Sequence, residues 1–415
     1  MKKKPDKGAG SPILGSDQSI TRIFINIVCV GALLLPHTGV AKPLQTEMFK
    51  EDNSNLRLSA SIRLELDDNV FHLDDDGKSR LTAAEERNIT SGRLTKMESI
   101  SDHVISTNFE LQYGLPKFKG PEATIKAEIT HHHYQKNYNS SYFDGQIRLT
   151  GRLSQNQSIR LQTEFTLDRF RKNYLSSVTD LNSNGNVPIN ERHYAPGIFN
   201  EVEQSIAYRH RFRLFQHKES RDLKIHIIFG GIYRNYEDPL TNRDREGAFG
   251  AFRFEGELSR QISLELELRR KNISTPGRNE IILVNETESG FDQDMNGDIR
   301  IKRNAPLNTA INRSRIRDTR QLETIWNINN DWRAIIGYRH RKSNFTSQNS
   351  LDVDHYGATE TGNRLKASLR WRLNKSWFIT FIFQRTDSED LEELGRDQGK
   401  YRQERVGVAI RHGFD

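Results

Sequence analysis

The chain has 415 residues, of which 34% are hydrophobic and 28% are charged, and its net charge is +7. This composition is too polar for a helical membrane protein. Part of the positive surplus falls in the N-terminal segment, so the remainder is too mild to indicate a nucleic-acid partner. The balance suits a transmembrane β-barrel, in which only every second strand residue meets lipid.

The only sustained apolar stretch lies near the N-terminus. Four lysines within residues 2–7 precede the apolar run at 23–35, and Gly39 and Ala41 place small side chains at −3 and −1. This pattern predicts a signal peptide over residues 1–41 and a short periplasmic lead over 42–54. The alternative is a membrane anchor, for which the apolar run is short. Cys29, the only cysteine, falls inside the predicted signal.

Apolar and polar residues alternate along most of the remaining chain, as they do where the two faces of a strand differ. In residues 363–373 and 377–385 this alternation predicts a hairpin with one apolar and one basic wall. The fourteen segments with this pattern are 56–71, 102–115, 122–135, 142–154, 158–170, 202–215, 223–236, 247–258, 261–273, 316–328, 332–344, 363–373, 377–385 and 403–414.

The connections between these segments are short after even-numbered segments and mostly longer after odd-numbered ones. A soluble β-sandwich, the alternative, gives no reason for this segregation. The sequence therefore predicts an all-β fold over residues 55–415. It would be a transmembrane antiparallel up-and-down β-barrel of about 14 strands, with short periplasmic turns and long extracellular loops.

Two stretches resemble bacterial outer-membrane β-barrel proteins. Val406, Val408, Ile410 and Phe414 alternate in the last segment, similar to the C-terminal signal that such barrels present to their insertion machinery. Residues 67–71, Asp-Asp-Asn-Val-Phe, resemble a stretch found in barrels linked to exopolysaccharide export and to lipoprotein assembly. The resemblance implies an outer-membrane location.

Charged residues fall opposite the apolar stripes, where they would face the lumen. We expect a basic pore lining that favours anionic solutes or glycans, and the alternative is a ladder of ion pairs that fills the lumen. Opposite charges on neighbouring strands, such as Glu164 and Arg152, are expected to lie side by side. The predicted pore-lining residues are Arg63, Arg148, Arg152, Arg160, Glu164, Glu255, Glu265, Arg333, Arg370 and Arg372.

Aromatic and basic residues recur together at the ends of odd-numbered segments. They predict an extracellular girdle that binds lipopolysaccharide phosphates, with a substrate funnel as the alternative. These runs are residues 133–136, 169–172, 233–234, 269–271 and 338–341.

Two loops contain sequences like calcium-binding loops, in which closely spaced oxygen ligands surround a glycine turn. The alternative is an ordinary turn rich in Asn, Asp and Gly. The candidate Ca²⁺ ligands are Asp180, Asn182, Asn184, Asn186 and Glu191 in one loop, and Asp292, Asp294, Asn296 and Asp298 in the other.

The sequence favours a porin-like outer-membrane channel for polar, anionic solutes or glycans. The competing hypothesis is a non-transporting surface barrel whose loops bind a partner or assist export of polysaccharide or lipoprotein. We predict no enzyme activity, since the chain lacks G-x-S-x-G, phosphate-loop and zinc spacings. A lipase triad spread over several strands would leave no such motif.

Overall fold

The structure is a computed structural model. It describes residues 56–86, 97–115, 122–178, 192–216, 219–275, 278–282, 292–293, 299–300, 307–348, 352, 355–391 and 397–414. The predicted signal peptide and periplasmic lead lie outside these residues.

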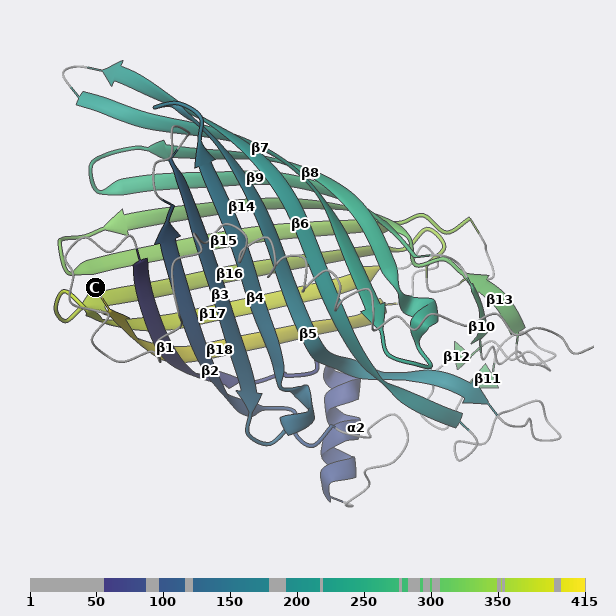
Figure 1. The fold of residues 1–415 in the computed structure, drawn as a ribbon. Coiled ribbons are helices and arrows are strands. Elements are labelled where there is room, and N and C mark those ends of the chain that lie inside the picture. Colours follow the sequence, from purple (N-terminus) through teal and green to yellow (C-terminus); the bar gives the residue numbers. More distant parts are fainter. Residues whose placement is uncertain are drawn as a thin grey trace, which may run out of the picture. The chain divides into compact units, whose positions relative to one another are not determined.

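Fourteen antiparallel strands form a closed barrel, in which the first strand pairs with the last (Figure 1). This confirms the predicted antiparallel up-and-down barrel of 14 strands, and every predicted segment contributes one strand. The barrel strands are β1 (Leu56–Asp67), β2 (Asp102–Gly114), β3 (Ala123–Tyr134), β4 (Tyr142–Arg152), β5 (Gln157–Val178), β6 (Arg192–Gln216), β7 (Glu219–Tyr236), β8 (Arg245–Glu257), β9 (Ile262–Ser274), β14 (Arg315–Asn327), β15 (Trp332–Phe345), β16 (Thr359–Arg372), β17 (Trp377–Leu391) and β18 (Asp397–Phe414).

Smaller elements lie in the connections. Helix α2 (Asp75–Glu86) follows β1, and two 3-10 turns, η3 (Tyr138–Ser140) and η5 (Thr241–Arg243), follow β3 and β7. Between β9 and β14, β10 (Arg278–Ile282) pairs with β13 (Leu307–Ile311), and β11 (Asp292–Gln293) pairs with β12 (Ile299–Arg300). None of the described helices is long and apolar enough to cross a membrane. The alternation pattern did not predict α2.

We call the barrel end that contains Leu56 and Phe414 the turn rim, and the end that contains Asp67 the loop rim. The strand pairs β4–β5 and β16–β17 are joined at the turn rim, and α2 follows the loop-rim end of β1. These names describe positions on the barrel. The assignment of the turn rim to the periplasm stays a prediction.

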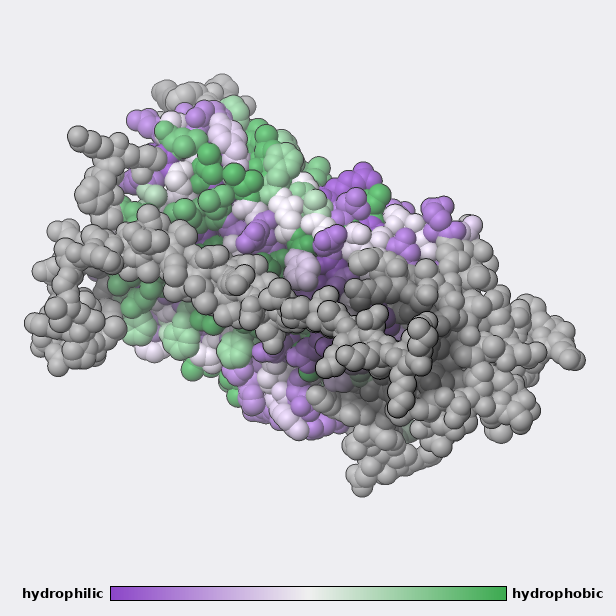
Figure 2. Space-filling view, turned by 45° about the vertical axis from the view of Figure 1, so that its right-hand side comes forward, coloured by the Kyte–Doolittle hydropathy of each residue, from purple (hydrophilic) through white to green (hydrophobic). Residues whose placement is uncertain are grey.

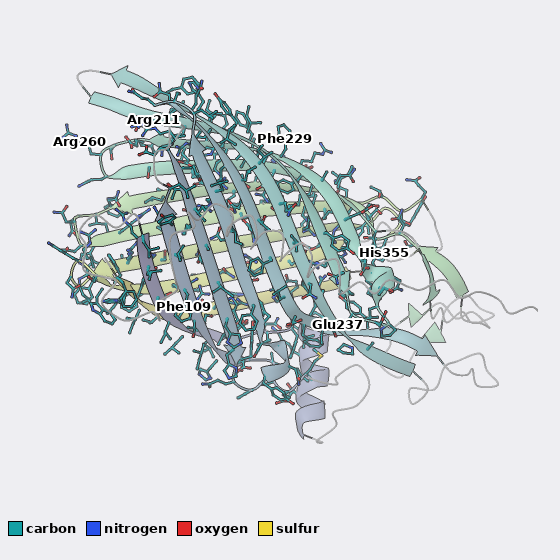
Figure 3. The ribbon with its side chains drawn as sticks, in the orientation of Figure 1. Phe109, Arg211, Phe229, Glu237, Arg260 and His355 are labelled. Atoms are coloured by element: carbon teal, nitrogen blue, oxygen red, sulfur yellow. The ribbon has the colours of Figure 1, made fainter. Side chains whose placement is uncertain are left out.

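Apolar side chains project outward from the barrel wall. Ile62, Phe109, Phe229 and Ile336 are 56%, 57%, 61% and 57% exposed, although each lies in the middle of a strand. Phe109 and Phe229 project from the outer face in Figure 3. Figure 2 shows hydrophobic residues gathered nearer the turn rim and hydrophilic ones nearer the loop rim. Exposed apolar area of this extent is stable in contact with lipid, and it is the expected surface of a barrel that crosses a membrane.

All four tryptophans lie on the outer face beside the turn rim. Trp326 and Trp371 are the penultimate residues of β14 and β16, and Trp332 and Trp377 begin β15 and β17. Trp332 and Trp371 stack with their ring centroids 5.4 Å apart. Tryptophan prefers the boundary between lipid and water. This cluster therefore marks the membrane boundary at the turn rim.

On the inner face, an aromatic ring packs directly over a glycine. Phe249 of β8 is 5% exposed and belongs to a buried cluster with Ala207, Ile228 and Ala251. Its ring covers Gly230 of β7, the residue with which it pairs. The absence of a side chain at Gly230 leaves room for the ring, because a Cβ there would overlap its Cζ atom.

We expect Gly230→Ala to destabilise the barrel. A methyl group there would overlap the Phe249 ring and the carbonyl oxygen of Gln204, and overpacking of this kind costs about 1–3 kcal/mol. Gly151→Ala is the matched control, because nothing lies within 4 Å of the added carbon. Thermal unfolding, followed by the change in gel mobility of the folded barrel, measures both variants. Equal melting temperatures would contradict the prediction.

Candidate functional site in the barrel lumen

All ten predicted pore-lining residues lie on the inner face of the wall. Each occupies the strand position opposite in parity to the exposed apolar residues, as Arg63 does between Ile62 and Leu64. The alternation of side chains along each strand fixes this direction. The structure thus places the side chains around the lumen. Their contact with a passing solute stays a prediction.

On strands β6, β8 and β9 the charges of the inner wall are balanced. Arg253 Nη2 lies 2.5 Å from Glu267 Oε2, and Arg253 Nε lies 3.3 Å from Glu265 Oε1. Arg269 bridges Glu267 at 3.0 Å and Glu203 at 2.8 Å, and Lys271 also pairs with Glu203. Three cations meet three carboxylates. We refer to these six residues as the balanced network; here the charges stiffen the wall, as in the alternative that the sequence left open.

The predicted contact between Glu164 and Arg152 is wrong. The strand register places Arg152 opposite Ser158 and Glu164 opposite Gln146, so the two charges are well separated along the strands. Arg152 Nη1 instead lies 3.3 Å from Glu122, and Glu164 accepts a hydrogen bond from Gln162. Alternation predicts the face of a residue but not its partner, because the partner depends on the register.

Strands β15 and β16 carry a different inner wall, with cations directly opposite each other. Arg333 pairs in register with Arg370, and Arg339 with Arg364. Like charges that face each other across a strand pair destabilise a sheet. We call the inward cations of these strands the basic track, which comprises Arg333, Arg339, Arg341, Arg364, Lys366, Arg370 and Arg372.

The basic track is almost without acidic partners. Among the described residues, only Arg341 of the track forms an ion pair, with Glu360. Arg370 lies over the ring of Phe378, 4.0 Å from its centroid, and Arg372 lies 5.8 Å from the same ring. The track extends from Arg341 near the loop rim to Arg372 at the turn rim. It therefore gives this wall a positive potential along the lumen.

At the loop rim, the Asp-Asp-Asn-Val-Phe stretch joins the first strand to the last through an ion pair and side-chain hydrogen bonds. Asp67 is fully buried and lies 2.8 Å from Arg405 Nη2, and it accepts two hydrogen bonds from Gln403. Asn69, also fully buried, donates to the carbonyl oxygens of Leu73 and Arg402 and accepts from the Leu73 N–H. We call Asp67, Asn69, Gln403 and Arg405 the seam clasp.

The rest of this stretch turns toward other strands. Val70 packs against the buried cluster of Val104, Tyr134 and Tyr142. Phe71 meets Phe170 of β5 edge to face at 5.9 Å, in a cluster that contains Leu81 of α2. In this chain, the stretch that resembles part of export-linked barrels therefore stabilises the pairing of β1 with β18 and packs against neighbouring strands. The sequence drew attention to this stretch, but it could not predict that Asp67 and Asn69 have their partners in β18.

Ser106, His132 and Asp144 form a hydrogen-bond chain with the residue types of a catalytic triad. Ser106 Oγ lies 2.9 Å from His132 Nδ1, and His132 Nε2 lies 3.4 Å from Asp144 Oδ2. Ser106 is only 2% exposed, and Tyr142 stacks on the His132 ring at 4.5 Å. A nucleophile must reach the carbonyl carbon of a substrate. We therefore assign the hydrogen bonds among Ser106, His132 and Asp144 to the packing of strands β2, β3 and β4.

The aromatic and basic runs at the loop rim divide between the two faces. In residues 338–341, Tyr338 is exposed on the outer face and donates to Asn363, whereas Arg339 and Arg341 belong to the inward basic track. Arg270 points outward near Asp318, at 3.6 Å, while its neighbours Arg269 and Lys271 point inward. The predicted girdle thus has fewer outward cations than the runs contain. Lipopolysaccharide binding stays a prediction.

The first predicted calcium loop lies outside the described residues, as do Asp294, Asn296 and Asp298 of the second. Asp292 is described as part of β11, but its side chain is not. In the part of the chain that the structure describes, no group of three or more His, Cys, Asp or Glu side chains is arranged to hold a metal ion. Calcium binding by these loops stays a prediction.

A closed barrel with a lipid-facing apolar surface and a charged lumen is the architecture of outer-membrane proteins. The chain has the architecture of a transmembrane β-barrel. No protein-family model matches its sequence, and no characterised protein matches it.

Solved structures that are similar to the chain include two channels and a porin. One is the outer membrane channel DcaP of Acinetobacter baumannii, with a TM-score of 0.41 and 9% identity, covering 86% of this chain and 96% of that one. Another is the anion-selective porin of Comamonas acidovorans, with a TM-score of 0.35 and 9% identity over 86% and 98% of the chains. A third is a mutant of the monoaromatic hydrocarbon channel TodX, with a TM-score of 0.41 and 6% identity over 87% and 90%. Because these TM-scores are below 0.5, the similarities carry no argument about a solute. A solute has to be inferred from the residues that line the lumen of this barrel.

We expect Asn69→Ala to loosen the seam clasp. The variant loses three side-chain hydrogen bonds and leaves carbonyl groups of Leu73 and Arg402 without that donor, a cost of about 1–3 kcal/mol. Asn344→Ala is the control, since its described side-chain hydrogen bond is an exposed one to Thr359. Urea unfolding of the refolded barrel measures the difference. If both variants unfold at the same urea concentration, the clasp does not stabilise the seam.

We also expect the loop-rim segment to weaken in acid through His72, which stacks on Tyr401 at 4.9 Å. Burial, followed by the positive charge of nearby Arg405, lowers the pKa of His72 from 6.5 to about 3. The unfolded chain therefore binds the proton more readily, so this contribution to stability is full above about pH 6.5 and declines as the pH falls toward 3.

His72→Asn removes this titration, and asparagine tolerates the left-handed backbone that His72 adopts at φ 55°. Melting temperatures of the native barrel and the variant are compared between pH 7 and pH 4. The native barrel should lose more stability over this range than the variant. Parallel pH profiles would show that His72 contributes nothing to acid sensitivity.

Proposed function

We propose that this barrel is an outer-membrane channel for polar, anionic solutes. The observation that carries the proposal is the pairing of like charges on β15 and β16, where Arg333 faces Arg370 and Arg339 faces Arg364. A wall that only needed to be filled would gain stability from alternating charges, as the balanced network does. The basic track instead keeps unneutralised guanidinium groups on the lumen side.

These guanidinium groups would lower the energy of an anion along the lumen. A unit charge about 5 Å from an ion changes its energy by roughly 0.8 kcal/mol at the dielectric constant of water, which is about a fourfold change in population. Several such groups in series raise the local concentration of anions and exclude cations. Passage of acidic glycans follows the same electrostatic rule.

The test is the conductance of the refolded barrel in a planar lipid bilayer, with ion selectivity taken from the reversal potential in a salt gradient. We expect open channels that prefer anions. The double variant Arg339→Gln/Arg364→Gln should lower the anion-to-cation permeability ratio by about twofold to fourfold per charge, less where salt screens the charges.

Arg320→Gln is the control, because Arg320 is exposed on the outer face of β14 and its substitution removes one positive charge outside the lumen. Its selectivity should equal that of the native barrel. A folded barrel that carries no current would overturn the channel proposal. An open barrel whose selectivity responds equally to both variants would overturn the role of the basic track.

A further inference from the structure

At the loop-rim end of the basic track, three arginines surround one carboxylate. Arg315 Nη1 lies 3.0 Å from Glu360 Oε2, Arg317 Nη2 lies 4.0 Å from the same oxygen, and Arg341 pairs with Glu360 Oε1. We call these four residues the Glu360 cluster. One carboxylate neutralises one guanidinium, so the cluster keeps a surplus of two positive charges.

The balanced network on the neighbouring strands has no surplus of positive charge among its own six residues. In the balanced network on β6, β8 and β9, three cations share three carboxylates, and several distances are 3.0 Å or shorter. Strand β9 separates Arg245 of β8 from the cluster, and Arg245 also interacts electrostatically with Arg315 and Arg317. This fourth guanidinium adds to the positive charge on the cluster.

The cluster also has more hydrogen-bond donors than acceptors. A guanidinium presents five N–H donors, while a carboxylate offers about four acceptor positions. The Nε atoms of Arg315 and Arg341 are buried, and neither has an acceptor among the described residues. Buried donors without acceptors are costly, and so is uncompensated charge.

Accessibility differs across the cluster in a way that suits a ligand from the lumen. The Arg315 side chain is 8% exposed, whereas that of Arg341 is 31% exposed. Arg317 donates to Ser343 Oγ at 3.0 Å, which fixes its side chain against β15. Arg315 and Arg317 are therefore held in the barrel wall, and Arg341 is the arginine that a solute in the lumen can contact.

We propose that the Glu360 cluster is a binding subsite for a phosphate-like oxyanion, either inorganic phosphate or the phosphoryl group of a small solute. The inference rests on the proposed channel function, because the solute would reach the cluster through the lumen. A dianion matches the surplus of two charges, and its tetrahedral oxygens can accept from several guanidinium groups at once. A single carboxylate matches only half of that charge.

Glu360 has a specific part in this subsite. It occupies guanidinium donors that the oxyanion also uses, so it competes with the ligand and lowers its affinity. A channel needs binding that is strong enough to select a solute and weak enough to release it. Glu360 therefore sets the release of the solute, while the arginines select it.

Titration of the refolded full-length barrel with inorganic phosphate in an isothermal calorimeter tests the subsite, with chloride and acetate as comparison anions. Arg341→Gln should weaken phosphate binding by about tenfold. Arg372→Gln, which removes the same charge from the turn-rim end of the track, should leave it within about twofold. Glu360→Gln should strengthen binding, an effect that a purely structural role of Glu360 does not produce.

The proposal is overturned if phosphate binds no more tightly than chloride, or if Arg341→Gln and Arg372→Gln weaken binding equally. If Glu360→Gln fails to fold, the comparison of Arg341→Gln with Arg372→Gln still tests whether phosphate binds at the Glu360 cluster. The outcome is separable from the channel proposal. A silent barrel that binds phosphate retains the subsite and loses the channel, whereas an anion-selective pore without phosphate binding retains the channel and loses the subsite.

Discussion

Every backbone N–H and C=O group that crosses lipid needs a hydrogen-bond partner, and the pairing of β1 with β18 supplies the last of them. Once the sheet closes, each strand has one face toward lipid and one toward the lumen. The outer face then accepts apolar side chains, and the inner face is where charge can be placed. The seam clasp reinforces this closing pair at one end, with Asp67 bound to Gln403 and Arg405.

Within the lumen, the same residue types serve two different purposes. In the balanced network, Arg253 and Arg269 each meet a carboxylate, and the ion pairs hold neighbouring strands together. On β15 and β16, Arg339 and Arg364 face each other and gain nothing from the pairing. Stability alone favours the first arrangement everywhere. The second arrangement leaves a positive potential along this wall of the lumen.

The sequence predicted the strands because a two-residue alternation survives along each of them, from Leu56 in β1 to Phe414 in β18. It could not predict α2 or the seam clasp, because Asn69 finds its partner in Arg402, more than three hundred positions later. It also misjudged Glu164 and Arg152, whose contact depends on register. In β5 the register shifts between Thr166 and Arg169, so alternation cannot assign the faces of residues beyond the bulge.

The position of the tryptophans has a spectroscopic consequence. Because Trp326, Trp332, Trp371 and Trp377 all lie at the turn rim, the intrinsic fluorescence of the barrel reports on one membrane interface only. Insertion from that side and insertion from the other would give emission signals at different times as the barrel enters a bilayer. The tryptophan fluorescence of the chain therefore reports which end of the barrel enters the lipid first.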